Sequence, residues 1–189
     1  MSRATRLGES LVAGALLASS VARARRLEVG PTEEAVFRRF NDCHDGFHVP
    51  VWPIMQSGTF GAVFVAGAVT HRRFGAREAA MVTAVGTAVW GGVKALKPLV
   101  GRGRPAAHLP DVSVRGAAQS GLGFPSGHAA VATTLALTTA TTWPGRVAGL
   151  AVAAVTGGGR MYVGAHLPLD VVAGFAIGAI AGIAARAVQ

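Results

Sequence analysis

The stretch LPLDVVAGFAIGAIAGIAA, from Leu167 to Ala185, is apolar over its whole length except for Asp170. An α-helix needs about 20 such residues to cross the hydrocarbon core of a bilayer. Many of the residues are alanine or glycine, and small residues let neighbouring helices approach closely in lipid. The stretch therefore predicts a closely packed membrane helix.

Further apolar runs precede this one along the chain. They extend from Val49 to Thr70, Ala79 to Val93, Ala129 to Trp143 and Val147 to Gly158, and we interpret all of them as helices. A shorter run, Leu11 to Ala22, could pass for a signal peptide, but the arginines that crowd its exit argue against cleavage. We interpret it as a short or tilted first helix. The expected fold is all-α, an integral membrane bundle of about six transmembrane helices in a single domain, residues 1–189.

Composition supports a membrane protein and narrows its partners. Of the 189 residues, 51% are hydrophobic and only 14% are charged, which is unusual for a soluble enzyme of this size. The low aromatic content, with many Ala, Gly and Arg residues, is typical of a GC-rich bacterial genome. The net charge of +9 is compatible with nucleic acid, anionic headgroups or a phosphorylated substrate. Membrane helices favour the last two, so we expect membrane lipids and a lipid phosphate as partners, and no nucleic acid. A homo-oligomer is possible but cannot be read from the sequence.

Two polar segments interrupt the apolar runs. Residues 94–128 carry many Gly, Pro and Arg residues and must form a structured loop outside the hydrocarbon. Residues 23–48 are similarly polar, and Glu33 to Asn41 could form an amphipathic helix at the interface. Residues 1–48 are thus an N-terminal helix and an interfacial segment. With six helices, the chain order places one set of basic and imidazole groups at the same membrane face: Lys97, His128, Arg160 and His166.

His166 and Asp170 are four residues apart, with Pro168 suited to the first turn of a helix. A carboxylate that holds one imidazole nitrogen as N–H leaves the lone pair of the other nitrogen free to attack. His166 is therefore a candidate nucleophile toward phosphorus. The alternative is an ordinary hydrogen-bonded pair near the membrane.

The sequence Pro125-Ser126-Gly127-His128 stands at the start of an apolar helix. Helix N-termini bind phosphate through free backbone N–H groups and the helix dipole, and Ser126 and Gly127 suit such a site. His128 would lie beside the phosphate as a general acid. The alternative is a simple serine N-cap with a neighbouring surface histidine.

Lys97, Arg104 and Arg160 offer the positive charge that a phosphoryl transition state needs on its oxygens. Basic residues at helix ends are more often membrane-surface anchors. The sequence leaves Arg102 and Arg115 undecided. Cys43, His44 and His48 loosely suggest a metal site, but their spacing matches no closed zinc pattern, so we expect no metal ligands.

Together these residues resemble the signature motifs of the type 2 phosphatidic acid phosphatase superfamily, the lipid phosphate phosphatases. The motifs are K-x6-R-P at Lys97 to Pro105, P-S-G-H at Pro125 to His128, and R-x5-H-x3-D at Arg160 to Asp170. The resemblance implies a phosphohistidine on His166, oriented by Asp170, with His128 as the acid, and it implies neither a metal nor a cofactor. The phosphate-binding residues that it implies are Lys97, Arg104, Ser126, Gly127 and Arg160.

The third motif departs from the family pattern in one residue. The family usually has serine before the arginine, whereas this chain has Gly159. A hydroxyl contact to phosphate is therefore absent, which would lower affinity or be replaced by a backbone N–H.

The resemblance also implies a function, hydrolysis of a lipid-linked phosphate monoester or diphosphate. Polyprenyl diphosphate or prenyl phosphate substrates fit a small bacterial enzyme, and phosphatidic acid or phosphatidylglycerol phosphate are the alternatives. The family suggests a multi-pass protein of the cell membrane with its active site on the extracytoplasmic side, although basic residues occur on both faces and do not decide orientation.

Two readings from other classes remain. A vanadium haloperoxidase-like enzyme would share the motifs, but such enzymes are soluble, which the apolar runs disfavour. A non-catalytic lipid-binding membrane protein would be favoured by a missing nucleophile, yet His166 is present.

Overall fold

The computed structural model describes residues 3–117 and 119–187, and all regular secondary structure in these residues is helical. The α-helices are α1 (Arg3–Ala24), α2 (Pro31–Asn41), α3 (His48–Met55), α4 (Phe60–Phe74), α5 (Ala76–Val100), α6 (Gly127–Thr139), α7 (Trp143–Tyr162) and α8 (Pro168–Ala187). Short 3-10 helices lie between them: η1 (Asp45–Phe47), η2 (Gln56–Gly58) and η3 (Pro105–Ala107). Since these residues contain no strand, the predicted all-α fold is confirmed.

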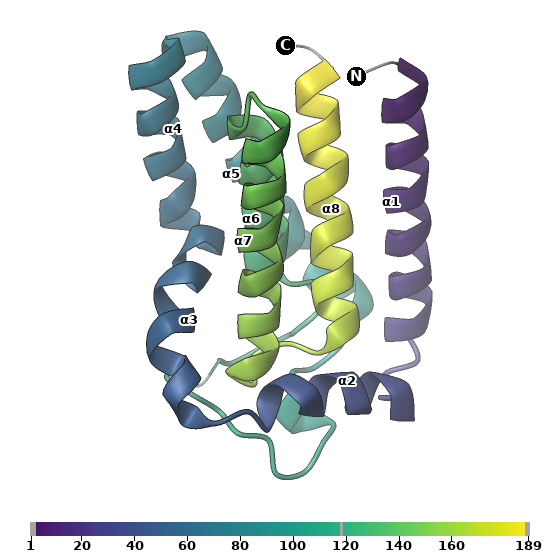
Figure 1. The fold of residues 1–189 in the computed structure, drawn as a ribbon. Helices are drawn as coiled ribbons and strands as arrows, with labels where there is room; N and C mark the ends of the chain where they lie inside the picture. Colours follow the sequence, from purple (N-terminus) through teal and green to yellow (C-terminus); the bar gives the residue numbers. More distant parts are fainter. Residues whose placement is uncertain (1–2, 118, 188–189) are drawn as a thin grey trace.

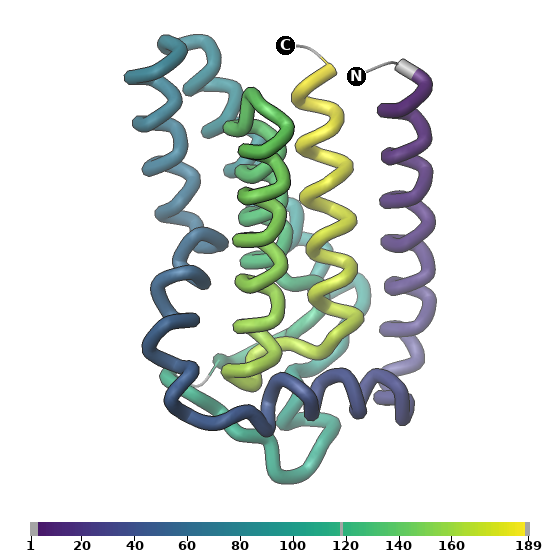
Figure 2. The backbone as a smooth tube through the Cα atoms, in the orientation of Figure 1, coloured from purple at the N-terminus to yellow at the C-terminus, as the bar shows by residue number. Residues whose placement is uncertain are grey.

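Helix α6 is the centre of the bundle. It packs against α5, α7 and α8, while α1 packs on α8 and α4 packs on α5 (Figure 1). Nine of the 13 residues of α6 are buried, all of them Ala, Val, Leu or Thr, as expected of a helix enclosed by others. The buried threonine hydroxyls donate to carbonyls four residues earlier in the same helix. Helix α2 lies across one end of the bundle, far from the first turn of α1 and the last turn of α8, as the backbone trace in Figure 2 also shows. The loop that joins α7 to α8 lies at this same end.

Glycines bring α8 unusually close to α6. A Cβ atom added at Gly174 or Gly178 would lie closer than 3.0 Å to the backbone oxygen of Ser126 or of Ala130, and one added at Gly182 would meet the Leu137 side chain. These glycines recur every four residues and so share one face of α8. The small residues of the Leu167 to Ala185 stretch therefore allow the close helix packing that the sequence predicts.

Membrane-spanning character is concentrated in part of the bundle. Among the described residues, Ala76–Ala107 and Pro168–Ala187 are long and apolar enough to cross a membrane. Asp45–Gly58 and Phe60–Phe74 qualify only as a pair, bent by 69° at the break between them. The protein is thus a helical membrane protein whose described residues include two such spans, or three if the bent pair is one span, and the expected count of six is not confirmed.

The apolar run from Val49 to Thr70 is not one helix. Thr59 has an extended backbone, and its hydroxyl accepts a hydrogen bond from the Ala62 N–H at 3.3 Å. It therefore caps a new helix, α4, instead of continuing α3. The break lies beside the start of α6, because a Cβ added at Gly58 would lie 2.8 Å from the Cα of His128.

Three other helices differ in their limits from the sequence interpretation. Helix α1 has 22 residues, Arg3–Ala24, so the expectation of a short first helix from Leu11 to Ala22 is wrong. Helix α5 continues to Val100, so that Lys97 lies in its last turn and not after it. Helix α6 ends at Thr139, and Trp143 already belongs to α7, whose N-cap is Thr142. Helix α2, in contrast, contains the whole expected segment from Glu33 to Asn41.

Candidate active site

A cavity of about 210 Å³ lies between α4, α5, α6, α7 and the loop that precedes α8. Most of the candidate residues of the sequence line it: Lys97, Arg104, Gly127, His128, Arg160 and His166. An apolar wall, with Phe60, Trp90 and Val93, faces these polar groups. Residues from α5, α6, α7 and two loops thus meet at one place, as the shared membrane face predicts. Ser126 and Asp170 lie behind this lining and are fully buried.

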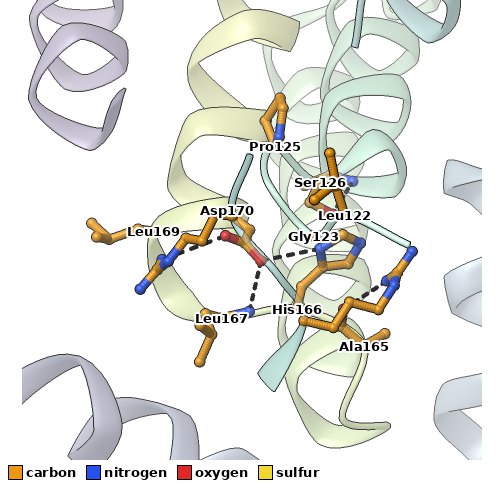
Figure 3. Close-up of polar contacts among 12 residues, drawn as sticks. Leu122, Gly123, Pro125, Ser126, Ala165, His166, Leu167, Leu169 and Asp170 are labelled. Atoms are coloured by element: carbon orange, nitrogen blue, oxygen red, sulfur yellow. Dashed lines mark hydrogen bonds and ion pairs between the residues drawn. The ribbon is translucent and has the colours of Figure 1, made fainter. Parts of the chain in front are cut away.

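His166 and Asp170 form the buried base of the site. The Nδ1 atom of His166 lies 3.3 Å from Oδ2 of Asp170, and the backbone N–H of Leu167 donates to the same oxygen at 3.0 Å (Figure 3). The exposed fractions of the His166 and Asp170 side chains are only 4% and 0%. A carboxylate held in this way favours the tautomer with a proton on Nδ1, which leaves a lone pair on Nε2.

The surroundings of His166 favour its neutral form. Burial, followed by the positive charges of Arg160, Lys97 and Arg104, holds the pKa of His166 well below its usual value, and a backbone hydrogen bond at Gly123 acts in the opposite direction. A neutral imidazole has the free lone pair that a nucleophile requires.

Ser126 is the N-cap of α6. Its hydroxyl oxygen accepts a hydrogen bond from the Ala129 N–H at 3.5 Å, and its backbone N–H donates to the carbonyl of Asp170 at 2.9 Å. The start of α6 is therefore tied to the start of α8. Gly127 and His128, the first residues of α6, line the cavity, so the positive end of the α6 dipole lies at its wall.

The three candidate cations are held differently. The Lys97 ammonium donates to the carbonyls of Leu122, Gly123 and Pro125 at 2.9, 2.9 and 3.1 Å, which fixes the loop before α6. Arg104 donates to the carbonyls of Ser120 and Ala165. The buried Nε of Arg160 has no hydrogen-bond partner in the part of the chain that the structure describes. Arg160 is thus the cation with a buried donor left for a ligand.

A second layer of charge lies behind Asp170, and the sequence did not reveal it. Arg102 is fully buried and donates from Nη1 and Nη2 to the two carboxylate oxygens of Glu33 at 2.9 and 2.7 Å. The same Nη1 lies 3.5 Å from Oδ1 of Asp170. The position of Arg102 inside the first basic motif was a signal, but nothing in the sequence links it to Glu33, which is 69 residues away.

The other undecided groups lie outside the cavity. Arg115 donates to the carbonyls of Asn41, Cys43 and Tyr162, so it holds the polar loop against α2 and α7. His44 caps the η1 turn, and His48 packs on a tryptophan ring. Within residues 3–117 and 119–187, no group of three or more His, Cys, Asp or Glu side chains could hold a metal ion.

Gly159 lies against α3 and not in the cavity lining. A Cβ atom added there would lie 2.7 Å from Cγ of Met55 and 2.8 Å from Cγ1 of Val51. A serine at this position would require both side chains to move. The absence of the usual serine therefore accompanies close packing of α3 on α7.

Comparison with known proteins identifies the family of the chain. The family model of the PAP2 superfamily matches residues 76–189. The crystal structure of LpxE from Aquifex aeolicus has 26% sequence identity and a TM-score of 0.73, over 85% of this chain and 98% of that one. A transmembrane PAP2-type phosphatidylglycerolphosphate phosphatase from Bacillus subtilis has the same fold, with 20% identity and a TM-score of 0.73, over 97% and 94% of the two chains. No protein of curated function matches the sequence. Because the family model covers more than half of its residues, the chain belongs to the PAP2 superfamily, as a membrane phosphatase.

Proposed function

We propose that the protein hydrolyses a lipid-linked phosphate monoester or diphosphate through a phosphohistidine on His166. The observation that carries this proposal is the pair of His166 and Asp170 at the base of a cavity lined by Arg104 and Arg160. A buried, neutral imidazole beside unpaired positive charge suits attack on a phosphate, because the same charges stabilise the transition state.

The first step transfers the phosphoryl group to the protein. The Nε2 lone pair of His166 attacks phosphorus, and the bond between phosphorus and the leaving oxygen breaks. His128, which lines the same cavity, gives a proton to that oxygen as general acid. Burial, followed by the charge of Arg160, lowers the pKa of His128 to about 3 in the protein alone, so this role requires the bound phosphate, whose negative charge offsets the neighbouring cations. Asp170 holds the proton on Nδ1 and stabilises the positive charge that develops on the ring.

The second step releases phosphate. Water attacks the phosphohistidine, its proton passes to His128 as general base, and the P–N bond breaks to restore neutral His166. Arg160, Arg104 and the first N–H groups of α6, at Gly127 and His128, hold the phosphate oxygens through both steps.

Lys97 and Ser126 complete the proposed phosphate site. Lys97 contributes its positive charge at the cavity wall while its N–H groups fix the adjoining loop. Ser126 lies behind the cavity lining and would act on the phosphate through the start of α6, because its hydroxyl oxygen accepts from the Ala129 N–H and caps the helix whose first N–H groups face the cavity.

The substrate is proposed to keep its tail in the membrane while its headgroup enters the cavity. Phe60, Trp90 and Val93 supply an apolar wall beside the charged one, and the Phe60 and Trp90 rings stack with centroids 4.2 Å apart. Such a wall suits the first carbons of a polyprenyl chain, which is the favoured class. The alternative is a glycerolipid, such as phosphatidic acid or the phosphatidylglycerol phosphate named for the Bacillus subtilis protein.

We also propose the location of the site. Residues 1–48 supply an N-terminal helix and an interfacial segment, and residues 97–170 carry the active site at the extracytoplasmic face of the cell membrane. The last turn of α8 lies at the opposite end of the bundle (Figure 1). A green fluorescent protein fused to the C-terminus should therefore fluoresce in the cytoplasm, whereas a dark fusion with full-length expression would reverse the orientation.

The decisive experiment measures phosphate release by the detergent-purified protein with a metal chelator present. The substrates are a prenyl diphosphate, a prenyl phosphate and glycerolipid phosphates. Activity that persists with chelator, and is lost in His166→Ala and His128→Ala, is the expected result. Loss of activity on chelation would refute the metal-independent mechanism, and full activity of either variant would remove that histidine from its role.

A further inference from the structure

We propose that Glu33 on α2 and Arg102 before η3 are positioning residues for the nucleophile, which act on His166 through Asp170. The proposal rests on the proposed function, in which His166 attacks phosphorus. Neither residue lines the cavity, so neither touches the substrate. Their effect on the reaction would pass through the carboxylate that orients the imidazole.

The two oxygens of Asp170 have different partners. Oδ2 receives the Leu167 N–H and faces Nδ1 of His166, whereas Oδ1 is buried and has no hydrogen bond, only the Arg102 guanidinium at 3.5 Å. Arg102 is therefore the one group on the far side of the carboxylate within the described chain. A positive charge at that position changes how strongly the Asp170 carboxylate attracts the Nδ1–H of His166.

Glu33 determines where the Arg102 guanidinium lies. It accepts two hydrogen bonds from Nη1 and Nη2, which hold the planar fork in one orientation. A fully buried guanidinium needs such a partner, since an unpaired charge in the interior is strongly destabilising. With Glu33 in place, Arg102 is only a 3.5 Å neighbour of Asp170 and not its hydrogen-bonded partner.

Glu33 also holds the backbone that carries Asp170. Its Oε1 accepts the N–H of Leu169 at 3.1 Å, at the second residue of α8. A carboxylate at a helix N-terminus pairs with a free N–H and with the positive end of the dipole. Glu33 thus fixes both the helix start that bears Asp170 and the guanidinium behind it (Figure 3 shows Leu169 beside Asp170).

Loss of the Glu33 charge would redistribute these contacts. Arg102 would retain only Asp170 as an anionic partner and would move toward it, drawing the carboxylate away from Nδ1 of His166. The imidazole would then be less well oriented, while the cavity that binds the phosphate would be unchanged. The expected signature is a lower kcat, counted per mole of folded protein, with an almost constant KM.

The test compares Glu33→Gln with Glu34→Gln, the neighbouring carboxylate on α2. Glu34 is a matched control because its side chain is 40% exposed and pairs only with Arg38, at 3.4 Å. The assay is phosphate release from whichever lipid phosphate the wild-type protein hydrolyses. Glu33→Gln should lower kcat by about tenfold to 100-fold with KM changed less than about twofold, and Glu34→Gln should match the wild type.

A double-mutant cycle shows whether Glu33 acts through Asp170. In an Asp170→Asn background, Glu33→Asp, which keeps a negative charge beside the buried Arg102, should cause little further loss of kcat, because the contact that Glu33 supports is already gone. Equal kcat values for Glu33→Gln and Glu34→Gln, or an undiminished loss in the Asp170→Asn background, would overturn the proposal.

A shorter acid covers the case in which Glu33→Gln does not fold. Glu33→Asp keeps the negative charge for Arg102 but cannot reach both Arg102 and the Leu169 N–H, so kcat should fall several-fold at constant KM. Wild-type kinetics in Glu33→Asp would refute the positioning role. If the wild-type protein releases no phosphate from any lipid, the proposed function fails first, which distinguishes the two outcomes.

Discussion

Asp170→Asn tests the central pair of the site, because it replaces the orienting carboxylate by a neutral amide of the same shape. In a catalytic triad this replacement lowers kcat by about 10⁴-fold, since the amide no longer fixes the correct tautomer. Here the Nδ1 to Oδ2 distance is 3.3 Å, which is longer than a strong charge-assisted hydrogen bond, and Asp170 shares its charge with Arg102. We therefore expect a smaller loss, about 10³-fold, which corresponds to about 4 kcal/mol of transition-state stabilisation.

The variant should fold, which makes its kinetics interpretable. Arg102 keeps Glu33 as a bidentate partner when Asp170 is neutral, so no buried charge loses its only counter-ion. The assay measures kcat for lipid phosphate hydrolysis, together with trapping of the phosphoenzyme by an alkaline detergent quench, because the P–N bond of a phosphohistidine hydrolyses in acid. Asp111→Asn is the control, because Asp111 is exposed and asparagine also tolerates its positive φ of 51°. A kcat within tenfold of the wild type would refute the orienting role of Asp170.

Three further predictions concern the acid, the nucleophile and the helix packing. His128→Ala should lower kcat by about 10²- to 10⁴-fold for a lipid alcohol leaving group, but less for p-nitrophenyl phosphate, whose leaving group needs less protonation, and equal losses would contradict the acid role. The pKa of His166 is held below its usual value, so His166 stays neutral as the pH falls through 6.5. The fall of kcat/KM at acid pH that protonation of His166 causes should therefore lie below pH 6.5, and a fall above that pH that disappears in a His166 variant would contradict this. Gly178→Val should lower the melting temperature in detergent, because the valine side chain would meet the Ala130 backbone. Gly91→Ala is the control, since a Cβ there has nothing within 4 Å, and it should leave the melting temperature unchanged or raise it. An unchanged melting temperature in Gly178→Val would show that α6 and α8 separate easily.

The sequence predicted six of the 13 residues that line the cavity, because helix order and motif spacing constrain their positions directly. Lys97, His128, Arg160 and His166 stand at the ends of apolar runs, and alternate runs cross the bundle in opposite directions. Their ends therefore meet at one face even when the limits of each helix are misjudged by several residues, as they were for α5. Such a prediction depends on topology and not on exact boundaries.

The break between α3 and α4 could not be predicted from hydropathy. The run from Val49 to Thr70 is apolar on average, although Gln56, Ser57 and Thr59 interrupt it. The new helix begins there because Thr59 accepts a hydrogen bond from the Ala62 N–H. Hydropathy averages over a window and does not detect a single capping side chain. The break has a structural consequence, since it places Gly58 against the His128 backbone at the cavity.

The positive charge around the cavity explains two properties of the site with one cause. Lys97, Arg104 and Arg160 line it together, and no acidic side chain is among its lining residues in the part of the chain that the structure describes. This excess of positive charge would attract a phosphate group, and it adds to burial in lowering the pKa of His166, which keeps the proposed nucleophile neutral. Once phosphate is bound, its negative charge offsets part of this field, so a positive charge on the ring becomes easier to form as the P–N bond develops. Asp170 lies outside the lining, where it stabilises that positive charge on the ring without repelling the substrate at short range. Phosphoryl transfer requires that the charges developing on the phosphate and on the imidazole are both stabilised. Cations around the cavity and a carboxylate behind the histidine meet this requirement together.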